Sequence, residues 1–160
     1  MESDSRPGWL INIQAPGTNP TSVEIDGQEY KYTIVSDEVE QDRLPYVAGF
    51  TQDGFLMISQ KVPLFEKPFI LSHEVREKKK FSDLPEEQRC LASLQQELSD
   101  FKNAYPDSYD DYVEKRFAFF NDLVSYYQNQ EQAAATVTPA FRQGILAARN
   151  FLHTISASRS

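Results

Sequence analysis

Apolar and polar residues alternate in the first third of the chain, which is the period of half-buried strands. The alternation is visible in Trp9–Gln14 and again in Glu29–Val35, where Tyr30, Tyr32 and Ile34 fall on one side. We therefore expect several short strands before Pro63.

Two Asp-Gly pairs predict where these strands turn. Asp-Gly favours a two-residue hairpin turn because both residues tolerate a positive φ. The pairs are Asp26-Gly27, between Ser22–Asp26 and Glu29–Val35, and Asp53-Gly54, between Tyr46–Thr51 and Phe55–Ser59. The pattern predicts an N-terminal antiparallel sheet with hairpins.

Between Pro63 and Pro68 the apolar period changes to about 3.6 residues, which is typical of amphipathic helices. We expect about four helices: Phe69–Lys80, a second ending near Ala104, Tyr109–Gln130, and a fourth that begins at the cap Thr138. Strands first and helices afterwards predict an α+β fold with the helices packed on one face of the sheet. Aromatic residues of the third helix, such as Phe119 and Phe120, are expected in the core rather than on a partner surface.

The predicted organisation is one domain over residues 9–155, with a disordered N-terminus at 1–8 and a flexible tail at 156–160. The formal charge of the 160 residues is −8. This charge argues against nucleic acid as a partner, because a phosphate backbone needs a basic surface. The single basic run, Lys78–Lys80, falls at the end of a helix, where cations complement the helix dipole.

The chain has no run of 18 apolar residues and no signal peptide. We expect a soluble, cytoplasmic protein that does not bind membranes.

Candidate chemistry concentrates in the first predicted helix. His73 and Glu77 are four residues apart and share a face, with Glu74 on the flank of that face. Imidazole and carboxylate groups bind metals, and a third carboxylate nearby can act on a bound water. Cys90 and Glu97 on the second helix are about 10 Å apart along its axis, so only one of them can complete a given site. Taken alone, Cys90 is expected to be a small buried residue and not a nucleophile.

The segment Tyr46–Phe101 resembles the core of the zincin metallopeptidases: a strand, a proline-containing connector, a helix with His-Glu, and a second helix with Glu. The resemblance implies that His73, Glu77 and Glu97 bind a zinc ion and that Glu74 is the general base. It also implies that Phe55–Ser59 is an edge strand that aligns a peptide. This sequence departs from the motif at Glu77, which replaces the second histidine and weakens affinity for zinc.

Two functions remain open from the sequence. The first is a small metal-dependent hydrolase-like, peptidase-like domain, either active or degenerate. The second is a non-enzymatic acidic domain that binds or regulates another protein or a peptide. If no metal binds, His73, Glu74 and Glu77 belong to a charged helix surface, with a carboxylate paired to Lys78 or Lys80.

Overall fold

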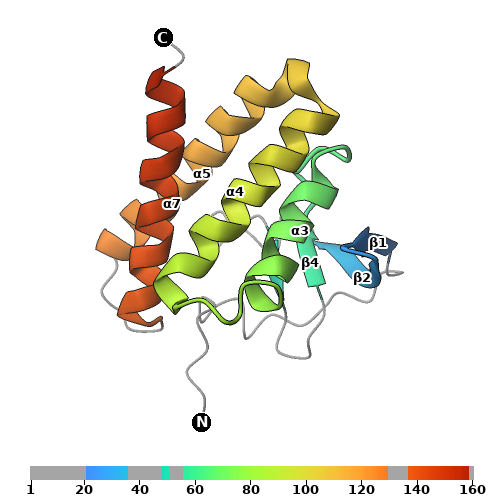
Figure 1. Ribbon diagram of the computed structural model, residues 1–160, viewed down its shortest axis with the longest axis horizontal. Coiled ribbons are helices and arrows are strands. Elements are labelled where there is room, and N and C mark those ends of the chain that lie inside the picture. Colours follow the sequence, from blue (N-terminus) through green and yellow to red (C-terminus); the bar gives the residue numbers. More distant parts are fainter. Residues whose placement is uncertain (1–20, 36–47, 51–55, 130–136, 159–160) are drawn as a thin grey trace.

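The computed structural model describes residues 21–35, 48–50, 56–129 and 137–158, and it has the predicted α+β order of strands followed by helices (Figure 1). The predicted strand Trp9–Gln14 and the proposed disordered segment 1–8 lie outside these residues. The last helix continues to Ser158, so it enters the segment that was predicted to be a flexible tail.

The hairpin at Asp26-Gly27 is confirmed. Strands β1 (Thr21–Ile25) and β2 (Gln28–Val35) are antiparallel, with Ile25 opposite Gln28 across the turn. Asp26 and Gly27 have φ values of 52° and 82°. Two consecutive positive φ angles match the twist of a two-residue hairpin, which explains why Asp-Gly occupies the turn.

The sheet is mixed, so the prediction of an antiparallel sheet is wrong in one pairing. Strands β3 (Ala48–Phe50) and β4 (Leu56–Ser59) are antiparallel, and the second Asp-Gly pair between them lies outside the described residues. Strand β4, however, pairs in parallel with β2, giving the order β1-β2-β4-β3. Parallel neighbours require a long connection, and 20 residues separate the end of β2 from the start of β4.

The central position of β4 also corrects the expectation that Phe55–Ser59 forms an edge strand. β4 has a partner on each side, and all four of its residues are buried. A strand paired on both sides has no free backbone groups with which to align a peptide. Its continuous apolar run, Leu56-Met57-Ile58, is typical of an inner strand.

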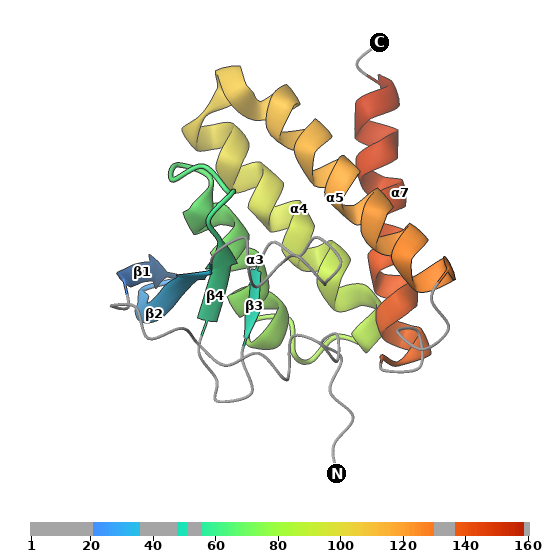
Figure 2. The same ribbon diagram turned by 180° about the vertical axis from the view of Figure 1, so that it is seen from behind.

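The helices form a layer of their own rather than packing together on the sheet. Helix α3 contacts β1, β3 and β4, whereas α4 packs on α3 and α7, and α7 packs on α5 (Figures 1 and 2). Of the helices predicted to pack on one face of the sheet, α3 makes the main contacts with the strands, and α4, α5 and α7 pack mainly on other helices. Their bounds are α3 Lys67–Lys78, α4 Glu86–Ala104, the short 3₁₀ helix η1 Pro106–Ser108, α5 Tyr109–Asn129 and α7 Pro139–Ser158.

The predicted helix starts and faces explain most of this packing. The Thr138 hydroxyl accepts a hydrogen bond from the backbone N–H of Phe141 at 3.0 Å, which confirms it as the cap of α7. The aromatic residues of α5 serve the core as predicted: Phe120 is buried, and Phe119 is half-buried against the core. Among the described helices, none is long and apolar enough to cross a bilayer.

Candidate metal centre

His73 lies at the interface of α3 and α4 and is 1 % exposed. The hydroxyl of Ser93 on α4 donates a 2.7 Å hydrogen bond to the His73 carbonyl oxygen. Ser93 is three residues after Cys90 and four before Glu97, so this bond places the imidazole between the two side chains. The sequence predicted that only one of Cys90 and Glu97 can complete a given site. Both side chains lie near His73, so the two ring nitrogens have to be considered separately.

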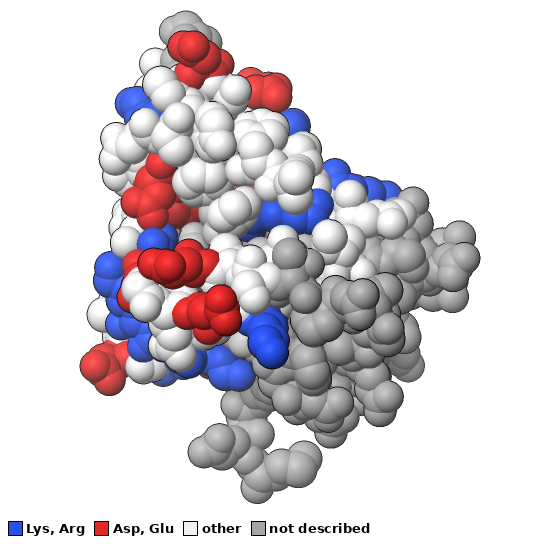
Figure 3. Space-filling model, turned by 90° about the vertical axis from the view of Figure 1, so that its right-hand side faces the viewer, with Lys and Arg blue, Asp and Glu red and all other residues white. Residues whose placement is uncertain are grey.

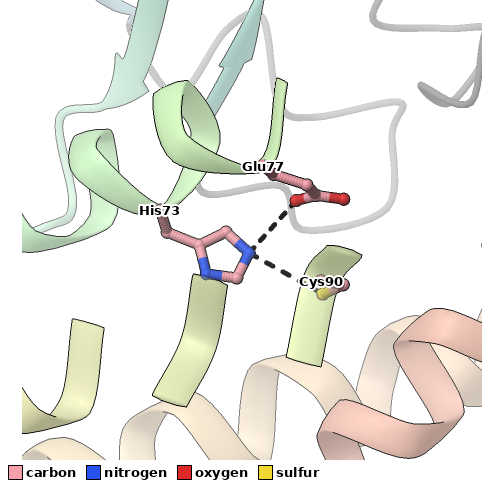
Figure 4. A group of neighbouring side chains, drawn as sticks. All are labelled: His73, Glu77 and Cys90. Atoms are coloured by element: carbon pink, nitrogen blue, oxygen red, sulfur yellow. Dashed lines mark hydrogen bonds and ion pairs between the residues drawn. The ribbon is translucent and has the colours of Figure 1, made fainter. Parts of the chain in front are cut away.

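One ring nitrogen faces two candidate ligands. His73 Nε2 lies 3.3 Å from Glu77 Oε2 and 3.7 Å from Cys90 Sγ (Figure 4). Donor atoms of these three residues all lie within 4.8 Å of one another. Within the part of the chain that the structure describes, this group has the composition and spacing of a possible metal site.

The other ring nitrogen faces Glu97. His73 Nδ1 lies 3.0 Å from Glu97 Oε1, and the two approach as an ion pair rather than as a straight hydrogen bond. The two ring nitrogens of an imidazole face different directions, so one metal ion cannot bind both. The predicted ligands His73, Glu77 and Glu97 are all near one another, but Glu97 is on the opposite side of the ring from Glu77.

Glu97 is fully buried and is held by two residues of α5. Arg116 Nη2 donates to Glu97 Oε1 at 3.0 Å, Arg116 Nε lies 2.9 Å from Oε2, and the Tyr112 hydroxyl also donates to Oε2. Burial alone would raise the pKa of Glu97, but the Arg116 charge and the contacts with His73 and Tyr112 lower it below its ordinary value. Glu97 is therefore a carboxylate at neutral pH.

The other titratable groups respond to burial and to these neighbours. Burial would lower the pKa of His73, but contacts with Cys90, Glu77 and Glu97 raise it well above its ordinary value. Burial and the Glu77 charge raise the pKa of the Cys90 thiol to about 11. In the absence of a metal, a protonated imidazole therefore lies between two carboxylates and beside a neutral thiol.

Glu74, the predicted general base, is half-buried and follows His73 on α3. Burial and the Glu77 charge raise its pKa to about 7. Glu74 does not belong to the compact group formed by His73, Glu77 and Cys90. Its role as a general base stays a prediction.

The alternative of a solvent-exposed charged helix surface is wrong for this part of α3. His73 is buried, and the Glu77 side chain is 24 % exposed. Two lysines of the basic run also contact neighbouring elements: the Lys78 ammonium lies 4.4 Å from the Phe50 ring centroid, and Lys80 donates to Gln96.

The roles of Ser93, Tyr112 and Arg116 were not predicted from the sequence. A signal for two of them exists, because the buried stripe of α5 contains Tyr112, Arg116 and Phe120 at four-residue spacing. A guanidinium in such a stripe requires a buried acidic partner. Glu97 lies in the corresponding buried stripe of α4, with Leu94, Leu98 and Phe101.

No protein-family model, curated protein sequence or solved structure matches this chain. The functional assignment therefore rests on the geometry of the site.

Proposed function

We propose that this chain is a small zinc-binding domain whose metal ligands are His73 Nε2, Glu77 and Cys90. The spacing of the donor atoms is the observation that supports the proposal. Tetrahedral zinc with Zn–N of about 2.0 Å, Zn–O of about 2.1 Å and Zn–S of about 2.3 Å separates N from S by about 3.5 Å and N from O by about 3.4 Å. The corresponding distances in this protein are 3.7 and 3.3 Å.

The ligand types favour zinc over calcium or magnesium. A thiolate and an imidazole suit zinc and other late first-row metals, whereas calcium and magnesium prefer oxygen ligands. Three protein ligands also leave a fourth tetrahedral position for a water or another small ligand, as in catalytic zinc sites. The proposed ligand set replaces Glu97 of the zincin-like prediction with Cys90.

A hydrolase-like activity is the finer part of the proposal. Zinc in such a site lowers the pKa of its bound water. Glu74 is the neighbouring carboxylate that would accept the proton, as the zincin resemblance implies. Replacing Glu74 with Gln is then expected to preserve metal binding and to remove hydrolysis of a peptide substrate.

Metal analysis of the full chain, purified without a histidine tag, tests the metal site. We expect one equivalent of Zn²⁺ or Co²⁺ per chain, with a cobalt–thiolate charge-transfer band that disappears in Cys90→Ser. His73→Ala and Glu77→Gln should lose the metal. His153→Ala is the matched control, because His153 is exposed on α7 and is the only other histidine.

Two results would contradict the metal site. One is equal metal binding by His73→Ala and His153→Ala. The other is a parent chain that contains no metal and whose thermal midpoint is unchanged by Zn²⁺ or Co²⁺.

A non-enzymatic, protein-binding domain is the second candidate, and an exposed apolar patch favours it. Leu64 is 75 % exposed, and Phe65 and Tyr105, whose rings are 5.2 Å apart, are 40 % and 41 % exposed. On the face of the molecule shown in Figure 3, residues other than Lys, Arg, Asp and Glu cover much of the upper part. This candidate replaces the first if no metal binds.

A further inference from the structure

Glu97 connects the proposed metal site to helix α5. Its Oε1 lies 3.0 Å from His73 Nδ1, and its two oxygens together receive Arg116 and the Tyr112 hydroxyl. The carboxylate accepts hydrogen bonds from Arg116 Nη2 and the Tyr112 hydroxyl, and Arg116 Nε and His73 Nδ1 lie 2.9 and 3.0 Å from its oxygens. A metal could bind Glu97 only by displacing one of these partners, so Glu97 is unsuited to be a ligand.

The same contacts fix the carboxylate in position. Arg116 meets both oxygens of Glu97 through two nitrogens, which sets the plane of the carboxylate. The Tyr112 ring is stacked on Phe101, with centroids 3.9 Å apart and planes 8° from parallel, so the ring has little freedom to turn its hydroxyl away. Glu97, Tyr112 and Arg116 are 0 %, 1 % and 4 % exposed, so water does not compete for these contacts.

We propose that Tyr112 and Arg116 are positioning residues that set the metal affinity of the site through Glu97, although α5 supplies no ligand. This inference rests on the proposed metal site. A carboxylate at Nδ1 holds the proton of a neutral imidazole on that nitrogen, which leaves the lone pair on Nε2, facing Cys90 and Glu77. Such partners of a metal-binding histidine typically change metal affinity by 10–100-fold.

A purely structural role for the same residues makes a different prediction. The buried contacts among α3, α4 and α5 stabilise the packing of the helices whether or not a metal binds. If that is their only role, removing the Tyr112 hydroxyl lowers stability but leaves the affinity of the folded protein for metal unchanged. Metal affinity measured well below the unfolding temperature separates the two roles.

The test compares Tyr112→Phe with Tyr127→Phe in the full chain. Both tyrosines are buried on α5, and the Tyr127 hydroxyl has no hydrogen-bond partner among the described residues. Tyr112→Phe preserves the ring that stacks on Phe101 and removes only the bond to Glu97. We expect the Kd for Zn²⁺, measured by competition with a chelator, to rise about 10–100-fold in Tyr112→Phe and to stay at the parent value in Tyr127→Phe.

Arg116→Lys gives a second measurement, because it preserves the charge and removes the two-nitrogen contact. We expect weaker zinc binding and a change in the visible spectrum of bound Co²⁺, since the ring of His73 is less well fixed. If this variant does not fold, Tyr112→Phe decides the question alone.

The possible outcomes distinguish this inference from the proposed function. If the parent binds no metal, the proposed function fails and the inference fails with it. If the parent binds zinc and Tyr112→Phe binds it equally well, the positioning role alone is overturned. An equal loss of affinity in Tyr112→Phe and Tyr127→Phe would also overturn it, because the loss would then be a general effect of altering α5.

Discussion

At the scale of single residues, His73 has two different neighbourhoods at its two ring nitrogens. Glu77 and Cys90 lie at Nε2, and Glu97 lies at Nδ1. The helical period predicts that His73 and Glu77 share a face, and their 3.3 Å contact confirms this. The sequence does not show which nitrogen faces which partner, because that depends on how α3 crosses α4. The zincin resemblance therefore implied Glu97 as the third ligand, whereas Cys90 is the residue whose Sγ lies 3.7 Å from Nε2.

Glu97 and Glu77 both contact His73 but differ in burial, so we expect their removal to lower the unfolding free energy by different amounts. Glu97→Gln leaves the buried Arg116 without its carboxylate partner, although His73 keeps Glu77 at 3.3 Å, and breaking a buried pair in this way typically costs about 3–5 kcal/mol. Glu77→Gln affects a partly exposed side chain, and such pairs contribute about 1 kcal/mol or less. We expect urea denaturation of the metal-free proteins to show a much larger loss of unfolding free energy for Glu97→Gln. A loss of only about 1 kcal/mol or less for Glu97→Gln would show that the Glu97 contacts do not stabilise the fold.

At the scale of secondary structure, local signals identify the elements but not all of their pairings. The Asp26-Gly27 hairpin, the cap at Thr138 and the spans of the helices follow from turn chemistry and period, which act within a few residues. The parallel pairing of β2 and β4 depends on a connection of 20 residues and on burial of both faces of β4. The apolar run Leu56-Met57-Ile58 contains that information, but its order in the sheet is settled only by tertiary packing.

Replacing a glycine with alanine is expected to have opposite effects on stability at Gly27 and at Gly144. Gly27 has φ of +82°, where an L-residue is strained by about 1–2 kcal/mol, so Gly27→Ala should destabilise the hairpin. Gly144 lies within α7, and a Cβ there would meet atoms of Glu86 and Glu87 at 3.6–3.7 Å, which is ordinary contact. Since alanine favours a helix by up to about 1 kcal/mol over glycine, Gly144→Ala should stabilise the protein. Thermal midpoints measure both effects, and a lower midpoint for Gly144→Ala would mean that α7 and α4 cannot accept the methyl group.

At the scale of the whole molecule, Arg76 joins the sheet to the helical layer. From α3, its guanidinium donates to Asp26 in the β1–β2 turn at 3.0 Å and to Asp100 on α4 at 2.8 Å. No local pattern predicts this contact, because the three residues are far apart along the chain. The basic run beside it, Lys78–Lys80, packs in part on Phe50 and Tyr30 of the sheet.

The absence of specific binding to duplex DNA at physiological salt stays a prediction from the charge of −8.

The Arg76 contact predicts a specific dependence of stability on pH. The hydrogen bond from Arg76 lowers the pKa of Asp26, so the unfolded chain takes up a proton at this residue at a higher pH than the folded protein does. The stabilisation from Asp26 is therefore complete above its unfolded pKa of about 3.9 and is lost as the pH falls through the folded pKa. Asp26 is 45 % exposed, so the contribution should be about 1 kcal/mol or less. We expect the unfolding free energies of the parent and Asp26→Asn to differ at pH 6 and to converge toward pH 3. A difference that persists unchanged at pH 3 would show that the substitution acts through the geometry of the turn and not through the lost charge.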